Sequence, residues 1–224
     1  MVRTAAILAA AAVTCILLDA DAFITRIAAQ SPDAVLSGLA RFEAFGHGVG
    51  TLLIVSTACL AGGLVRIQQA LLLVSAFGAG ICASLLKVIF VRPRPFLLLS
   101  GQAEANLSTV VQHGSFSAAL EHLRNSHLQA FPSAHTAAAF GLATALGHVV
   151  PNARCWWLVL ATGCGLQRIF AQKHYASDVL AGASLGLLWA HITAVLLANG
   201  SFSQQRPRIR PAQMHSREPL RKVA

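Results

Sequence analysis

The chain has 224 residues, of which 55% are hydrophobic and 11% are charged, and its mean hydropathy is +0.62. This composition is too apolar for an ordinary soluble domain and indicates an integral membrane protein. The net charge of +9 does not indicate nucleic-acid binding, because six of the seventeen basic residues lie in the last 24 residues rather than on a folded face. The five cysteines lie in apolar segments at no metal-ligand spacing, so we interpret them as small buried hydrophobes.

Six apolar segments follow one another along the chain, and several approach the roughly 20 residues that cross a bilayer. They run from Thr4 to Leu18, His47 to Val65, Gln69 to Val91, Thr136 to Val150, Cys155 to Ala171 and Val179 to Ala198. We therefore predict an all-α polytopic membrane protein, a bundle of six transmembrane helices that forms a single membrane-embedded domain over residues 1–200.

The first apolar segment has two interpretations. It follows Arg3 and precedes the small-residue triplet Ala20-Asp21-Ala22, a pattern that fits a cleavable secretory signal as well as a membrane anchor. Both interpretations give the same later topology, because removing a first helix that enters from the cytoplasm leaves the new N-terminus outside.

Basic residues predict how the bundle is oriented in a bacterial inner membrane or a plasma membrane. Residues 201–224 are rich in arginine and predict a disordered cytoplasmic tail. The segments on the periplasmic or extracellular face are then Asp19 to Gly46, Arg92 to Ala134 and a turn around Lys173. The longest of them contains AALEHLRNSHL, from Ala118 to Leu128, which fits either a short amphipathic surface helix or a solvated lid.

Polar and charged side chains gather at the predicted outer ends of the helices, where each charge needs an exit to the interface or a partner. They are Lys87, Arg92, Arg94, Ser133, His135, Arg168, His174 and Asp178. Singly they have ordinary explanations, with Lys87 as a snorkelling lysine, Ser133 as a helix N-cap and Asp178 as an acid at a helix start. Together on one face they form a set of groups suited to a phosphate.

The cations and one helix start of this set can hold a phosphate dianion. Lys87, Arg94 and Arg168 supply positive charge, and each guanidinium group can reach two oxygens. The free N–H groups after Ser133 add donors aligned with the helix dipole. Pro132 prevents the helix from extending backward over those donors.

The two histidines divide the remaining chemistry. His174 and Asp178 are four residues apart, so a helical turn would place the carboxylate against one ring nitrogen and leave the other free to attack phosphorus. His135, beside the phosphate cradle, is the better general acid toward the leaving oxygen and then the base toward water. This scheme needs no metal and no cofactor.

Three motifs, in this order, resemble the signatures of the type 2 phosphatidic acid phosphatase superfamily, which includes lipid phosphatases, soluble acid phosphatases and vanadium haloperoxidases. They are KVIFVRPRP from Lys87 to Pro95, PSAH from Pro132 to His135 and QRIFAQKHYASD from Gln167 to Asp178. The resemblance implies a six-helix bundle that hydrolyses a lipid phosphomonoester or pyrophosphate at the outer leaflet through a phosphohistidine. The residues it implies are His174, His135 and Asp178 for catalysis, and Lys87, Arg94, Ser133, Ala134 and Arg168 for phosphate binding.

Two positions depart from the family pattern, with Ala134 in place of glycine and Gln167 in place of serine. The methyl group of Ala134 is tolerable unless the position needs a positive φ angle, and the Gln167 amide can still donate a hydrogen bond. The alternative function is a catalytically idle relative that binds or transports a phosphorylated lipid, although such a protein can lose His174 or Asp178 and this chain keeps both. In either case the partners are a phosphorylated lipid and the bilayer, and the sequence does not choose the lipid.

Overall fold

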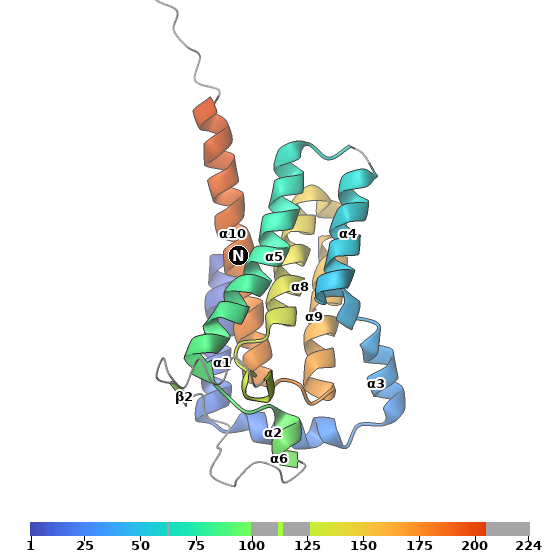
Figure 1. Cartoon of the computed structure of the whole chain (residues 1–224), viewed down its shortest axis with the longest axis vertical. Coiled ribbons are helices and arrows are strands. Elements are labelled where there is room, and N and C mark those ends of the chain that lie inside the picture. The colour runs from blue at the N-terminus through green and yellow to red at the C-terminus, as the bar shows by residue number, and fades with distance from the viewer. Residues whose placement is uncertain (62, 100–111, 114–125, 205–224) are drawn as a thin grey trace, which may run out of the picture.

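The computed structural model of the chain describes residues 1–61, 63–99, 112–113 and 126–204, which form a helical bundle (Figure 1). The helices are α1 (Val2–Leu17), α2 (Ala20–Ala29), α3 (Asp33–Ala40), α4 (Gly48–Leu60), α5 (Arg66–Ile89), α6 (Pro95–Leu99), α8 (Ala134–Val149), α9 (Arg154–Phe170) and α10 (Ala176–Gln204). Single 3-10 turns occur at η1 (Glu43–Phe45), η2 (Ser126–Leu128) and η3 (Pro151–Ala153), and two-residue strands β1 (Phe90–Val91) and β2 (Gln112–His113) pair antiparallel. The predicted all-α membrane fold is confirmed.

The six predicted apolar segments correspond to α1, α4, α5, α8, α9 and α10. Two helices are long and apolar enough to cross a bilayer by themselves, α5 and the part of α10 from Ala176 to Asn199. Two further pairs reach that length only across a bend, α1 with α2 at 87° and Asp33–Phe45 with α4 at 54°. The described residues thus contain two spans, or four if each bent pair is one, and the count of six stays a prediction.

Helix α8 lies at the centre of the bundle, packed against α5, α9 and α10 (Figure 1). Glycines allow this close packing: a Cβ on Gly141 would lie 2.3 Å from the carbonyl oxygen of Ser75 in α5. A Cβ on Gly186 of α10 would lie 2.4 Å from the carbonyl oxygen of Ala137 in α8. Such close backbone approach is typical of membrane bundles, where packing holds the helices together. The N-terminus of α8 is therefore held firmly between its neighbours.

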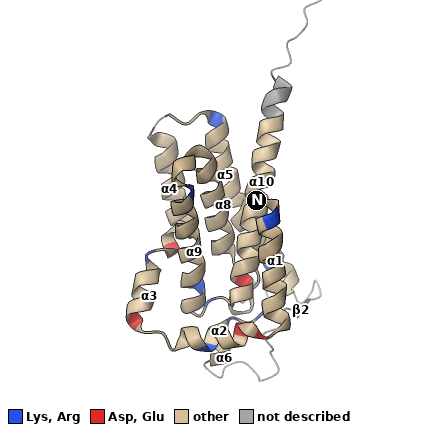
Figure 2. Ribbon diagram, turned by 180° about the vertical axis from the view of Figure 1, so that it is seen from behind, with Lys and Arg blue, Asp and Glu red and all other residues tan. Residues whose placement is uncertain are grey.

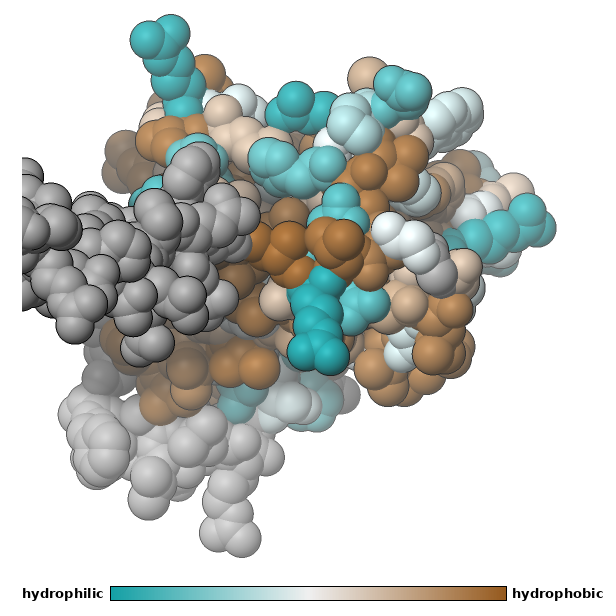
Figure 3. Space-filling model, turned by 90° about the horizontal axis from the view of Figure 1, so that it is seen from above, coloured by the Kyte–Doolittle hydropathy of each residue, from teal (hydrophilic) through white to brown (hydrophobic). Residues whose placement is uncertain are grey.

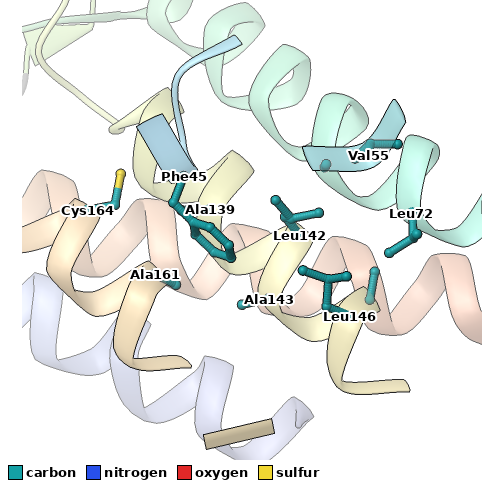
Figure 4. Packing of buried hydrophobic residues seen from close by; sticks show 11 residues of the cluster. Phe45, Val55, Leu72, Ala139, Leu142, Ala143, Leu146, Ala161 and Cys164 are labelled. Atoms are coloured by element: carbon teal, nitrogen blue, oxygen red, sulfur yellow. The ribbon is translucent and has the colours of Figure 1, made fainter. Parts of the chain in front are cut away.

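The main hydrophobic core lies between α4, α5, α8, α9 and the turn at η1 (Figure 4). Its buried side chains include Phe45, Val55, Leu72, Leu142 and Leu146. Because Phe45 belongs to η1, this core also fixes the turn between α3 and α4 against the rest of the bundle.

Helices α2, α3 and α6 lie at one end of the bundle, where α5 and α9 end and α8 and α10 begin (Figure 1). The middles of the helices are largely uncharged (Figure 2), and the opposite end exposes hydrophilic residues beside hydrophobic ones (Figure 3). Helix α10 continues to Gln204, past the predicted domain boundary at residue 200. The rest of the predicted tail lies outside the described residues, as does most of the segment predicted as a surface helix or lid, of which Ser126–Leu128 is a 3-10 turn.

Candidate active site

The second and third motifs are joined directly by main-chain hydrogen bonds at this end of the bundle. The N–H of Ser133 donates to the carbonyl oxygen of Asp178 at 3.1 Å, which ties the start of α8 to the start of α10. The N–H of His174 donates to the carbonyl oxygen of Arg168 at 3.2 Å. Backbone contacts therefore join two pairs of the predicted site residues, Ser133 with Asp178 and Arg168 with His174.

His174 faces Asp178, as their spacing predicted. Nδ1 of His174 lies 3.5 Å from Oδ2 of Asp178, which is long for a hydrogen bond, so the pair is a close electrostatic contact. Other groups fix the carboxylate: Oδ2 accepts from the N–H of Tyr175 at 2.8 Å, and Oδ1 accepts from the guanidinium of Arg92. The histidine lies in the turn before α10 rather than in a helix, and it is buried together with the carboxylate.

Burial keeps the ring of His174 neutral. It lowers the pKa of His174 from 6.5 to about 4, although the contact with Asp178 opposes this shift. The positive charges of Lys87 and Arg94 lower the same pKa further, which also places both cations within electrostatic reach of the ring. A neutral imidazole has one nitrogen without a proton, and this is the form that a nucleophile requires.

Arg92 is the charged residue to which sequence analysis gave no role, and it is fully buried. Its NH2 lies 2.7 Å from Oδ2 of Asp21 in α2, and its NH1 pairs with Asp178 and donates to Oγ of Ser177 at 2.7 Å. The ring of Tyr175 lies 4.1 Å from the guanidinium carbon. Burial opposes the charge, but Asp178 and Asp21 together raise the pKa of Arg92. Arg92 is thus the centre of a buried ionic network that holds Asp178.

Sequence analysis also missed two acids. Asp21 was considered only as part of a possible cleavage triplet, yet it is buried and accepts from the N–H of Ser177 at 2.9 Å. Glu43 in η1 pairs with Arg168 and with the side chain of Gln167. The low number of acids could have identified both residues. The chain has only eight acidic residues, and an acid beside an apolar segment needs a partner.

The cations predicted to bind phosphate retain unused donors. The Nε atoms of Arg94 and Arg168 are buried and have no hydrogen-bond partner among the described residues. Nζ of Lys87 donates to the carbonyl oxygen of Gln129 at 3.1 Å, a bond that uses one of its three hydrogens. Burial and the like charge of Arg168 lower the pKa of Arg94. Converging cations with buried, unpaired N–H groups are the surroundings that an anion would complete.

The start of α8 presents donors to the same region. Ser133 is the N-cap, and its Oγ accepts from the N–H of Thr136 at 3.4 Å and from the Thr136 hydroxyl at 2.9 Å. Ala134 is the first helical residue and is not among the non-glycine residues with positive φ, which in the described chain are Asp19 and Gln172. The methyl group of Ala134 therefore causes no backbone strain.

His135 lies on the side of the site that faces α4 and α5. The centroids of the His135 and His47 rings are 5.6 Å apart. His135 also lines a groove of about 230 Å³, together with residues that include Thr51, Phe77 and Gly80. A larger apolar cavity of about 530 Å³ between α1, α8, α9 and α10 contains none of the predicted site residues, so we associate the smaller groove with the site. No three His, Cys, Asp or Glu side chains of the described segments are placed to hold a metal ion.

Sequence comparisons give one family. The family model of the PAP2 superfamily matches residues 68–202, more than half of the chain. A lipid A 1-phosphatase of Porphyromonas gingivalis is 43% identical over 63 residues, which cover 26% of this chain and 14% of that protein. A lipid A 1-phosphatase of Rhizobium johnstonii is 30% identical over 74 residues, which cover 33% of this chain and 30% of that protein. The chain thus matches less than a third of the length of either relative.

Two solved structures have a similar fold. The crystal structure of Aquifex aeolicus LpxE has a TM-score of 0.59 at 22% identity, covering 78% of this chain and 94% of that one. The PAP2 type phosphatidylglycerolphosphate phosphatase of Bacillus subtilis has a TM-score of 0.57 at 21% identity, covering 92% of this chain and 95% of that one. At these identities the likeness concerns the fold.

Proposed function

Because the chain belongs to the PAP2 superfamily, we propose that it is a membrane phosphatase that hydrolyses a lipid phosphomonoester or pyrophosphate through a phosphohistidine. One observation carries the proposal: His174 is buried against Asp178 while Arg94 and Arg168, at the same end of the bundle, keep buried N–H groups unpaired. A neutral imidazole among cations that keep unpaired N–H groups suits a phosphate as its target.

In the first proposed step, the phosphate is held by Lys87, Arg94 and Arg168 and by the N–H groups at the start of α8. The unprotonated nitrogen of His174 attacks phosphorus while the bond from phosphorus to the lipid oxygen breaks. His135, protonated beside the bound phosphate dianion, donates a proton to that oxygen, so the lipid leaves as an alcohol, or as a lipid monophosphate from a pyrophosphate.

In the second step, His135 takes a proton from water as the water oxygen attacks phosphorus. The bond from phosphorus to nitrogen breaks, which restores His174 and releases inorganic phosphate. Asp178 holds the ring in place and balances its positive charge while the phosphoryl group is attached. The Arg92 network keeps Asp178 fixed throughout.

The groove beside His135 supports a lipid as the substrate. It lies between α4, α5 and α8, and its lining is mostly apolar, so it suits the hydrophobic part of a leaving group that His135 protonates. Since both relatives described above are named lipid A 1-phosphatases, lipid A 1-phosphate is the first substrate to test. The density of arginines in residues 201–224 supports a cytoplasmic tail and hence a site at the outer leaflet.

The test is phosphate release by detergent-purified protein with EDTA present. The panel contains lipid A 1-phosphate, phosphatidylglycerophosphate, phosphatidic acid and a polyprenyl pyrophosphate, and the control is His174→Ala. We expect release that survives EDTA and falls by at least roughly 10³-fold in the variant, as for other nucleophile deletions. Release that stops with EDTA, or that persists in His174→Ala, contradicts the mechanism. A folded protein that binds these lipids without releasing phosphate would favour the idle binding protein.

A further inference from the structure

We infer that Glu43 and Gln167 form a clamp that orients the guanidinium group of Arg168 toward the substrate phosphate. Glu43 is then a positioning residue supplied by the turn between α3 and α4, a part of the chain outside the three motifs. The inference rests on the proposed function only in taking phosphate as the ligand of Arg168.

Both contacts that Arg168 makes in the clamp use the same nitrogen of its guanidinium group. NH1 of Arg168 donates to Oε1 of Glu43 and, at 3.3 Å, to Oε1 of Gln167. Nε2 of Gln167 donates to Oε2 of Glu43 at 3.2 Å, so the three side chains form a closed ring. Nε of Arg168 has no partner among the described residues. Because the clamp contacts NH1, it leaves the other N–H groups of Arg168 for a phosphate and restrains the rotation of the guanidinium group.

Tight backbone packing fixes the position of Glu43. On one side of it, the ring of Phe42 lies on Gly163 of α9, where a Cβ would come within 2.5 Å of the ring. On the other side, a Cβ on Gly46 would lie 2.3 Å from the carbonyl oxygen of His135. The turn is thus wedged against α8 and α9. Both oxygens of the Glu43 carboxylate accept hydrogen bonds, although the side chain itself is 37% exposed.

The residue at position 167 fits this arrangement. The resemblance described above places a serine there, and a serine has a single short hydroxyl group. The longer amide of Gln167 presents an acceptor to Arg168 and a donor to Glu43 at once. Gln167, which departs from the family pattern, thus bridges Arg168 and the acid Glu43 on a distant segment. This bridge is what the clamp requires of position 167.

The experiment measures affinity for inorganic phosphate by calorimetry on the full chain in detergent, which needs no turnover. We expect Glu43→Ala to weaken phosphate binding about tenfold, because a charge-assisted contact that orients Arg168 is lost. KM for a lipid substrate should rise by a similar factor, while kcat and the melting temperature change little. Glu43→Gln should show a smaller effect, because its amide oxygen still accepts from NH1. Asp33→Asn, an exposed acid of α3, is the matched control and should change nothing.

Several results would overturn the clamp. Unchanged phosphate affinity in Glu43→Ala would show that Glu43 has no part in phosphate binding. Tighter binding would show that Glu43 competes with phosphate for Arg168. If Glu43→Ala does not fold, Glu43→Gln decides, and wild-type affinity in that variant rejects the clamp. Wild-type protein that binds no phosphate rejects both the clamp and the proposed function. Weaker binding in the variant of a protein that releases no phosphate from any lipid would keep the clamp and reject only the phosphatase.

Discussion

Arg92 and Arg94 are two residues apart in the sequence RPRP, and the structure uses them in opposite ways. Arg92 is surrounded by the carboxylates of Asp21 and Asp178, a hydroxyl group and an aromatic ring. Arg94 makes no ion pair with a described acid, and burial together with the like charge of Arg168 lowers its pKa. The buried Nε of each arginine has no partner among the described residues, so the carboxylates make the difference. They neutralise Arg92 within the fold, whereas the charge of Arg94 is available to an anion.

The energetic reason is desolvation. A buried charge is tolerated only when the protein replaces the water it has lost, and the Arg92 network does so with two carboxylates. Around Arg94, Lys87 and Arg168 the charges are alike and repel one another. That repulsion is relieved when an anion binds, so this region gains from phosphate and the Arg92 network does not. The predictions below separate the two regions by stability and by activity.

Arg92→Ala should have the largest effect, and on stability. The change leaves Asp21 and Asp178 buried without their cation, and breaking such a pair costs about 3–5 kcal/mol. We expect thermal unfolding in detergent to shift down by several degrees or the purified yield to collapse. The control is Arg26→Ala, which removes an exposed arginine from α2. A variant of Arg92 that melts with the wild type would show that the network does not stabilise the fold.

Arg94→Ala should act on catalysis instead. Removing one preorganised donor from a developing charge typically costs roughly 10²- to 10³-fold in turnover. The melting temperature should stay the same or rise slightly, because a source of repulsion between cations is removed. Steady-state kinetics and thermal unfolding on the same preparation check both. If Arg94→Ala unfolds as readily as Arg92→Ala, the distinction between the two arginines is wrong.

The sequence predicted the helical segments and the end of the bundle at which the candidate site residues lie. Apolar runs located α5 and α10 well, and Ser133 with Pro132 marked the start of α8. These signals are local, since hydrophobic length and capping depend on neighbours along the chain. The count of six spans stays a prediction, because α1 turns by 87° into α2, a bend that the sequence analysis did not predict.

The roles of Arg92 and Glu43 lay beyond sequence reasoning because their partners are distant. Arg92 pairs with Asp21, 71 residues away, and Arg168 pairs with Glu43, 125 residues away. Composition can show that an acid in a membrane protein needs a partner, but only the packing of α2 and η1 over the end of the bundle selects which cation it meets.

The protonation of His174 offers a smaller test that links the two regions. Its pKa of about 4 lies below the ordinary 6.5, so the ring stays neutral down to about pH 4. Between these values the unfolded chain binds more protons than the folded one, so acidification through this range also destabilises the fold. At pH 5 the neutral fraction should be about 30 times that of an unperturbed histidine.

Proton NMR of the imidazole resonances in detergent checks this directly. The resonance that vanishes in His174→Ala identifies the residue, and we expect it to titrate near pH 4. Titration near pH 6.5 would show that the buried environment does not keep the nucleophile neutral. Asp178→Asn should lower the midpoint further, because the carboxylate is the group that favours the charged ring.

Ser133 stands on the border between the two regions and should give the smallest effect. Its Oγ caps α8 by accepting from the N–H of Thr136, which is a stabilising role, while its hydroxyl hydrogen can point to a bound phosphate. Ser133→Ala should cost about 1 kcal/mol through the lost cap. It should also lower kcat/KM about tenfold through one lost hydrogen bond to the charged phosphate. Thermal unfolding reports the first loss and kinetics reports the second. A drop in stability with unchanged kcat/KM would assign Ser133 to the fold alone, beside Arg92, and would leave the phosphate to the cations and the backbone N–H groups.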